Sequence, residues 1–309
     1  MKPKLHTLLY DLDIEDYHRG TVGHSSSQLK DALEDESEFV AKYIHKTVER
    51  EEIAAFDVGT YFHTGILEPH KLKDDTVVFP GKIRKGKEWE KFKAVNKGRA
   101  IVTIQQKDQA ETLVKAVKKN TIAKKYLNGK AEVSLFVEIA IYIGTIYAPY
   151  FGQRLDRDGW SDDLTGSQIA KKKGVVFIVK VRADMLGADY VSDLKSTTGN
   201  ARSNQAMRYK ISDYHYDLSA SLYVDMFALL TPVNKFIWIF ASKDKGNCRC
   251  YRASTNNMLV GRAKYSKALV KIAELSKNNW EVVDFLDTLE PMPHELKYLE
   301  TTQSDGDLL

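Results

Sequence analysis

Two short apolar segments in the middle of the chain, residues 175–184 and 190–195, restrict the fold most strongly. Their residue types are typical of β-strands, and a turn that contains Gly187 separates them. Two strands joined by so short a turn are expected to pair with each other. Helical patterns precede and follow this strand cluster, and that order of elements predicts an α/β or α+β core.

The part of the chain before the strands is predicted to be helical. Ser25–Ser27 is expected to cap a helix that continues through Ile44. Further helices are predicted over residues 52–67 and 107–119. Between them, residues 82–99 combine eight basic side chains with Trp89 and Phe92, which indicates a basic loop and a short helix.

The remaining elements follow from the same patterns. They are a strand over 132–147, a polar insertion over 153–173, helices over 201–211, 216–230 and 256–277, and a hairpin of 235–242 with 249–253. We therefore expect a helical N-terminal part (1–130), a core (131–290) with that insertion, and a polar tail (291–309), all in one compact unit.

Composition excludes several classes of protein. At 309 residues with 43% hydrophobic and 28% charged side chains, the chain has the balance of a globular protein. Its apolar runs are far shorter than the ~20 residues that span a bilayer, and the first ten residues lack a secretion signal, so a soluble cytoplasmic protein is expected. The net charge of +4 permits nucleic-acid binding without arguing for it. Cys248 and Cys250 are too few for an iron–sulfur cluster and are expected to be reduced structural thiols.

The chemistry is expected at the second of the two central strands. Asp193 and Lys195 are two residues apart and should project from one face, and the preceding turn can bring Asp184 beside Asp193. Two adjacent carboxylates are unfavourable unless a cation neutralises them, and Mg²⁺ or Mn²⁺ prefers oxygen ligands. Such an ion would lower the pKa of a bound water, while Lys195 would orient the nucleophile or stabilise negative charge. The alternative is a solvated ion pair on a strand.

These residues resemble the core motif of the PD-(D/E)XK nucleases, and more narrowly that of the RecE group (the exonuclease VIII type of phages and prophages). The motif consists of Asp184 and the run Asp193-Leu194-Lys195-Ser196-Thr197-Thr198. Three further segments match that group in the expected order, namely Ser25–Lys30, Gly59–Pro69 and Ala131–Ser134. The resemblance implies a restriction-endonuclease-like core, with a central mixed sheet flanked by helices.

The resemblance also assigns roles to individual residues. It implies that Asp184 and Asp193 bind the metal, with the Leu194 carbonyl as a further ligand, and that Lys195 is the catalytic lysine. His63 would be a metal ligand or would position the substrate, and Glu132 would be an accessory acidic residue. A structural helical histidine and a merely exposed glutamate remain the alternatives for these last two.

DNA contacts are predicted around this site. Tyr223 occupies the tyrosine position of a Gln-x-x-x-Tyr pattern found in related nucleases, although Ser219 replaces the glutamine. The tyrosine either touches DNA or is a half-buried core residue. The predicted phosphate contacts are Arg202, Arg208 and Lys210 after the catalytic strand, and Arg84 and Lys85 in the basic segment. A solvated helix is the alternative for that segment.

The resemblance implies an enzyme that digests linear double-stranded DNA from its 5′ ends and leaves 3′ single strands for recombination. It further implies a phage or prophage origin, work in the bacterial cytoplasm, a single-strand annealing recombinase as partner, and a homo-oligomeric ring. Two alternatives keep the fold: an endonuclease or nickase with the same site, and a DNA-binding protein without catalysis.

Overall fold

The computed structural model describes residues 4–283 except positions 11, 21, 49–53, 143, 152 and 156–173. The predicted tail (291–309) and nearly all of the predicted insertion (153–173) lie outside the described residues. No helix in the described ranges is both long enough and apolar enough to cross a bilayer.

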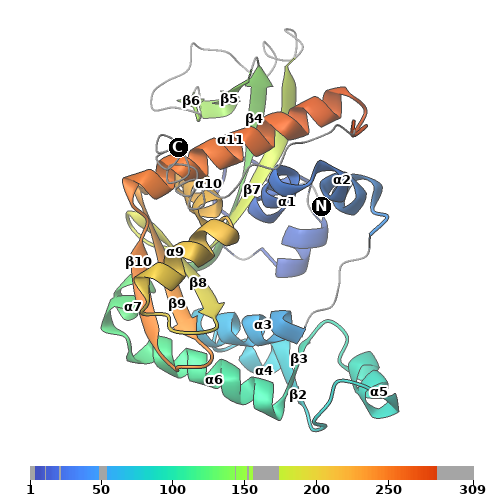
Figure 1. Ribbon diagram of the computed structural model, residues 1–309, viewed down its shortest axis with the longest axis vertical. Coiled ribbons are helices and arrows are strands. Elements are labelled where there is room, and N and C mark those ends of the chain that lie inside the picture. Colours follow the sequence, from blue (N-terminus) through green and yellow to red (C-terminus); the bar gives the residue numbers. More distant parts are fainter. Residues whose placement is uncertain are drawn as a thin grey trace, which may run out of the picture.

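A mixed β-sheet forms the centre of the molecule (Figure 1). Its order is β10-β9-β8-β7-β4-β5-β6, and β1 (His24–Ser25) pairs in parallel with β7. The other strands are β4 (Lys130–Tyr142), β5 (Thr145–Ala148), β6 (Gln153–Arg154), β7 (Val175–Leu186), β8 (Tyr190–Thr197), β9 (Lys235–Ser242) and β10 (Cys248–Arg252). Along that order only β8 and β9 pair in parallel. The predicted mixed sheet flanked by helices is confirmed.

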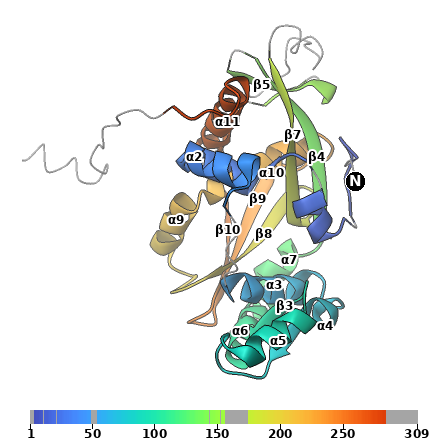
Figure 2. The same cartoon turned by 90° about the vertical axis from the view of Figure 1, so that its right-hand side faces the viewer.

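Helices from distant parts of the sequence cover one face of this sheet (Figure 2). They are α1 (Ser26–Glu34), α9 (Asn204–Asp213), α10 (Tyr216–Ala228) and α11 (Thr255–Lys277). α9 and α10 form the crossover that a parallel pair such as β8 and β9 requires. The main core lies between these helices and the sheet, where Trp238, Phe240 and Tyr265 are almost completely buried. This layer places α1 and the start of α10 next to β8.

A second layer covers the opposite face at the β8–β10 end. It consists of α3 (Ala54–Leu67), α6 (Ile104–Lys119) and α7 (Thr121–Tyr126). Phe62, Leu113 and Val117 from these helices pack against Leu194 and Ile239 of the sheet. Because the N-terminal helices share a core with the strands, His63 is brought up to β8 from a remote part of the sequence.

The predicted helical N-terminal part also contains strands. β2 (Thr76–Phe79) and β3 (Ala100–Thr103) form a separate parallel pair, flanked by α4 (Leu72–Asp75) and α5 (Lys87–Val95). Each strand has only four residues, so neither extends over enough of the sequence to show a periodic pattern. The N-terminal part is mainly helical as predicted, with α5 inside the predicted basic segment, and it contains in addition this short pair of strands, which the sequence did not indicate.

Two longer elements are divided where local geometry changes. The helix expected from Ser25 to Ile44 is three pieces, α1, α2 (Glu36–Phe39) and a π-helix η2 (Val40–His45). It breaks at Asp35, which is extended and whose carboxylate accepts a hydrogen bond from the Glu38 amide to cap α2. The single strand expected over 132–147 is the hairpin of β4 and β5, in which Gly144 adopts a φ of 68°.

Candidate active site

Strands β7 and β8 separate immediately beyond their connecting turn. They pair only at Met185 with Ser192 and at Leu186 with Val191. Beyond this point the Asp184 side chain occupies the gap, and its Oδ2 accepts a hydrogen bond of 2.7 Å from the Leu194 amide. The carboxylate thus replaces a strand-to-strand hydrogen bond, which fixes it between the two strands.

The alternation along β8 divides its side chains between the two helical layers. Val191 joins the core beneath α10, whereas Leu194 packs with the helices on the other face. Asp193 and Lys195 share the face of Val191. They form an ion pair in which the Lys195 Nζ lies 2.7 Å from the Asp193 carboxylate.

Three side chains from three different elements meet beside Asp193. His63 on α3, Glu132 on β4 and Asp184 on β7 each offer a ligand atom, and these atoms all lie within 4.8 Å of one another. The His63 Nδ1 is 3.4 Å from the Asp184 Oδ2, and the imidazole side chain is 30% exposed. Solvent and substrate can therefore reach this group of residues.

The backbone turns Glu132 into the site. The pairing of β4 with β7 runs from Ala131 with Met185 to Val133 with Ala183 and omits the residue between them. Glu132 has a φ of 55°, in the left-handed region that costs a non-glycine residue about 1 kcal/mol or more. Arg182 holds the carboxylate through a 2.5 Å hydrogen bond from Nε.

Burial among like charges shifts the pKa of each acidic group. Burial, reinforced by repulsion from Asp193, raises the pKa of Asp184 to about 7. Burial and the charge of Asp184 likewise raise the pKa of Glu132, and Arg182 opposes this. Arg182 pairs with Glu132 and Lys195 pairs with Asp193, so Asp184 is the carboxyl whose charge a cation would favour most.

The two basic groups respond in opposite ways. Burial, together with the positive charge of Lys195, lowers the pKa of His63, so its imidazole is neutral at pH 7 and available as a ligand. Burial also lowers the pKa of Lys195, but Asp193 and Asp184 outweigh it and raise the pKa above its usual value. Lys195 therefore remains a charged ammonium.

This donor set fits a divalent cation. Two carboxylates and a neutral imidazole converge, and carboxylate oxygens are the ligands that Mg²⁺ and Mn²⁺ prefer. Asp193 adds a third carboxylate beside Asp184, although Lys195 holds it. The closest group thus contains Glu132, expected only as an accessory residue. The resemblance implied the Leu194 carbonyl as a metal ligand. At this residue the amide donates a hydrogen bond to the Asp184 carboxylate, and a backbone hydrogen bond to the His63 ring acts to raise the pKa of the imidazole. Metal binding by the carbonyl stays a prediction.

Tyr223 lies at the edge of this site. Its hydroxyl is 3.5 Å from the Ser26 Oγ on α1. Burial raises its pKa to about 12, and the charge of Asp193 contributes to the shift. Ser219, one turn earlier on α10, is buried. The ring packs on the main core, as the core-aromatic alternative expects, and contact of Tyr223 with DNA stays a prediction.

The side chains predicted to contact phosphate differ in whether they are exposed or already bound to other residues. Arg202 and Arg208 are exposed near α9, Lys85 is exposed before α5, and the Lys210 ammonium lies 5.9 Å from the Tyr214 ring. Arg84 is bound differently. Its guanidinium pairs with Asp57 on α3 and lies 4.6 Å from the centre of the Trp89 ring. Its contacts therefore join α3 to α5.

Three residues near the site had no role in the sequence-based expectations. Arg182 holds Glu132, and Lys30 and Tyr216 lie beside Lys195. Arg182 lies two residues before Asp184 on β7. This spacing could have indicated that both residues share a face of the strand, but not that Arg182 pairs with Glu132. No local pattern indicates that α1 and α10 come together at β8.

The comparisons with known proteins agree with this architecture. Residues 25–143 match the model of the PDDEXK-like domain of unknown function (DUF3799). The matched segment carries His63 and Glu132 and ends before Asp184. No curated protein matches the chain.

Solved structures extend the comparison to almost the whole chain. The crystal structure of a "putative exonuclease" from Eubacterium rectale is 15% identical, with a TM-score of 0.55 over 92% of this chain and 97% of that one. A second structure, SSO0001, is 14% identical over 84% of this chain and 88% of that one, but its TM-score of 0.28 supports no inference about fold. Together the family model and the Eubacterium rectale structure show that this chain has the fold of a PD-(D/E)XK nuclease.

Proposed function

We propose that this protein is a metal-dependent deoxyribonuclease that degrades linear double-stranded DNA from its ends. The observation that carries the proposal is the convergence of His63, Glu132, Asp184 and Asp193 beside the Lys195 ammonium at the fork between β7 and β8. Such a group has no evident structural purpose, because it gathers buried carboxylates that repel one another. It matches the needs of phosphodiester hydrolysis.

Each residue has a definite part in the proposed reaction. His63, Glu132 and Asp184 would hold the divalent ion, with Asp193 as a neighbouring ligand. When bound, such an ion supplies a Lewis acid for the phosphoryl oxygen and favours ionisation of water. Lys195 remains charged and stabilises the negative charge that develops on the phosphate, while Asp193 keeps the ammonium in position. Arg182 orients Glu132.

The decisive test uses linear and covalently closed duplex DNA with Mg²⁺, Mn²⁺ or EDTA. We expect loss of the linear DNA alone, and only with a metal. Lys195→Met should lower kcat by roughly 10²- to 10³-fold, as expected when one preorganised electrostatic group is removed. Lys271→Met, which removes a lysine paired with Glu36 on another part of the surface, should cleave at the wild-type rate. Cutting of closed circles would instead identify an endonuclease, and binding without cleavage would contradict the proposed catalysis.

Metal binding can be measured independently of activity. In the wild type, Mn²⁺ should raise the melting temperature, because a ligand that binds only the folded state stabilises it by about 2.7 kcal/mol at 100 times its Kd. Asp184→Asn should abolish most of this rise. An equal rise in both proteins would show that the ion binds elsewhere.

The finer parts of the proposal rest on the RecE-like motif. We propose digestion in the 5′ to 3′ direction, 3′ single strands as products, and a single-strand annealing protein as partner in a bacterial cytoplasm. DNA labelled at either its 5′ or its 3′ ends distinguishes the directions, because the label is released first from the end at which digestion starts. Light scattering at several concentrations tests the proposed ring.

A further inference from the structure

Lys30 on α1 places a second ammonium beside Lys195. The Lys30 Nζ lies 5.1 Å from the centre of the Tyr216 ring, and the Lys195 Nζ lies 5.3 Å from the same ring. Burial lowers the pKa of Lys30 to about 7, and repulsion from Lys195 adds to this. The two amines are thus close enough to affect each other, although they lie far apart in the sequence.

No carboxylate of the described residues forms an ion pair with Lys30. Asp31, Asp193 and Asp217 are near enough to act on its pKa. Each of them is bound elsewhere: Asp31 to Tyr43 and Lys42, Asp193 to Lys195, and Asp217 to Lys264. A half-buried amine without its own counter-ion is held partly neutral, and an anion brought to it would favour its charged form.

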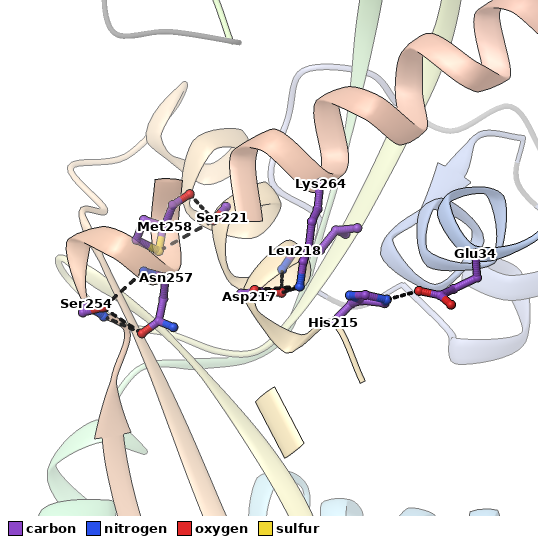
Figure 3. A network of polar contacts seen from close by, with 9 residues as sticks. All are labelled: Glu34, His215, Asp217, Leu218, Ser221, Ser254, Asn257, Met258 and Lys264. Atoms are coloured by element: carbon purple, nitrogen blue, oxygen red, sulfur yellow. Dashed lines mark hydrogen bonds and ion pairs between the residues drawn. The ribbon is translucent and has the colours of Figure 1, made fainter. Parts of the chain in front are cut away.

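The residues on both sides of Tyr216 are bound to neighbouring helices. Tyr216 is the first residue of α10, between His215 and Asp217. His215 contacts Glu34 on α1, and Asp217 forms hydrogen bonds of 2.9 and 3.0 Å with Lys264 on α11 (Figure 3). Contacts with α1 and α11 therefore hold the backbone that carries the Tyr216 ring, near which both amines lie.

From these contacts we propose that Lys30, supported by the Tyr216 ring, binds a DNA backbone phosphate next to the scissile one. This inference rests on the proposed nuclease function, since it assigns a substrate contact at the same site. Lys195 serves the reacting phosphate, and Lys30 serves its neighbour on the same strand. The contact recognises charge alone and is independent of base sequence.

The test compares Lys30→Met and Lys30→Arg with Lys271→Met in the full chain. Lys30→Met should raise KM about tenfold, the effect of losing one charged hydrogen bond, with kcat within about twofold of the wild type. In EDTA, the slope of log affinity for duplex DNA against log salt should fall by about one, because one phosphate contact is lost. Lys30→Arg should keep most of the affinity, and Lys271→Met should match the wild type.

Stability provides a second readout. Removing this half-buried amine, which has no counter-ion, should leave the melting temperature of the free protein unchanged or raise it by roughly 2–4 °C, so weaker DNA binding would not reflect unfolding. Tyr216→Leu should raise KM like Lys30→Met and also lower kcat, since Lys195 shares the ring.

The outcomes separate this inference from the proposed function. A wild-type KM and salt slope in Lys30→Met, or equal losses in Lys30→Met and Lys271→Met, would overturn the phosphate site while leaving the nuclease intact. If the wild-type protein binds DNA but cleaves none, and the salt slope still falls in Lys30→Met, the nuclease function is refuted and the phosphate contact of Lys30 is retained.

Discussion

Asp184 shows how a single residue is positioned at a cost to the free protein. Its side chain is only 15% exposed, it accepts a hydrogen bond from the Leu194 amide, and it faces the carboxylate of Asp193. The amide favours the charged form, whereas burial and the neighbouring charge disfavour it. Burial and the charge of Asp193 outweigh the amide and raise the pKa of the carboxyl, and a bound cation would favour its ionised form.

The metal-free protein should therefore lose stability as pH rises. The folded-state pKa of Asp184 is about 7, above the value of 3.8 that the group has when exposed. The favourable contribution of its proton is complete below pH 3.8 and is lost as pH rises through 7. Asp184→Asn should thus stabilise the metal-free protein by about 1–3 kcal/mol at pH 8, and much less at pH 5. Urea unfolding in EDTA at both pH values measures this, and a gain of equal size at both would contradict the assigned pKa.

The packing of α10 against α11 supports one side of the site. Gly261 on α11 lies directly against α10, where an added Cβ would be 2.1 Å from the Asp217 carbonyl and 2.3 Å from the Ser221 Oγ. The helices approach this closely because glycine has no side chain. Tyr216 and Tyr223 both depend on this approach, since both lie on α10.

Gly261→Ala should separate the two helices. We expect a loss of about 2–3 kcal/mol in the free energy of unfolding, because the clash is with backbone and cannot be relieved by a side-chain rotation. The matched variant is Gly59→Ala on α3, where an added Cβ meets nothing within 4 Å. It should gain about 0.5–1 kcal/mol from helix propensity. Denaturant midpoints compare the two, and similar shifts in both would show that the α10–α11 contact is not tight.

The whole molecule is joined across the boundary expected near residue 130. Phe62, Leu113 and Val117 on the N-terminal side share a core with strands β8 and β9, and Asn120 donates a hydrogen bond of 3.0 Å to the Cys248 carbonyl. His63 can act with Asp184 only while this contact persists. The N-terminal part therefore supplies His63 to the site and holds it in place.

We predict that both parts unfold together. Native-state hydrogen exchange should give amides of α6 and β9 the same free energy of opening, because each layer covers apolar surface of the other. Opening of α6 at a clearly lower free energy would instead show that the N-terminal part unfolds separately from the core. In that case the melting temperature of the core would not respond to changes in α3.

Local chemistry was enough to predict the strands of the site and the common face of Asp193 and Lys195. Strand alternation depends only on the residues themselves, so the spacing in the chain carries over directly into space. The helices α9, α10 and α11 were recognisable for the same reason, from patterns complete within each segment. The four-residue strands β2 and β3 contain too little of a pattern to be seen.

The arrangement between segments depends on packing across long stretches of chain, and no local pattern encodes it. Folding places His63 against Asp184, gives Glu132 its left-handed backbone and brings Lys30 to the ring that carries Lys195. It also pairs Arg84, expected to bind DNA, with Asp57. These contacts form because burying the apolar faces of the helices fixes which polar side chains meet at β8.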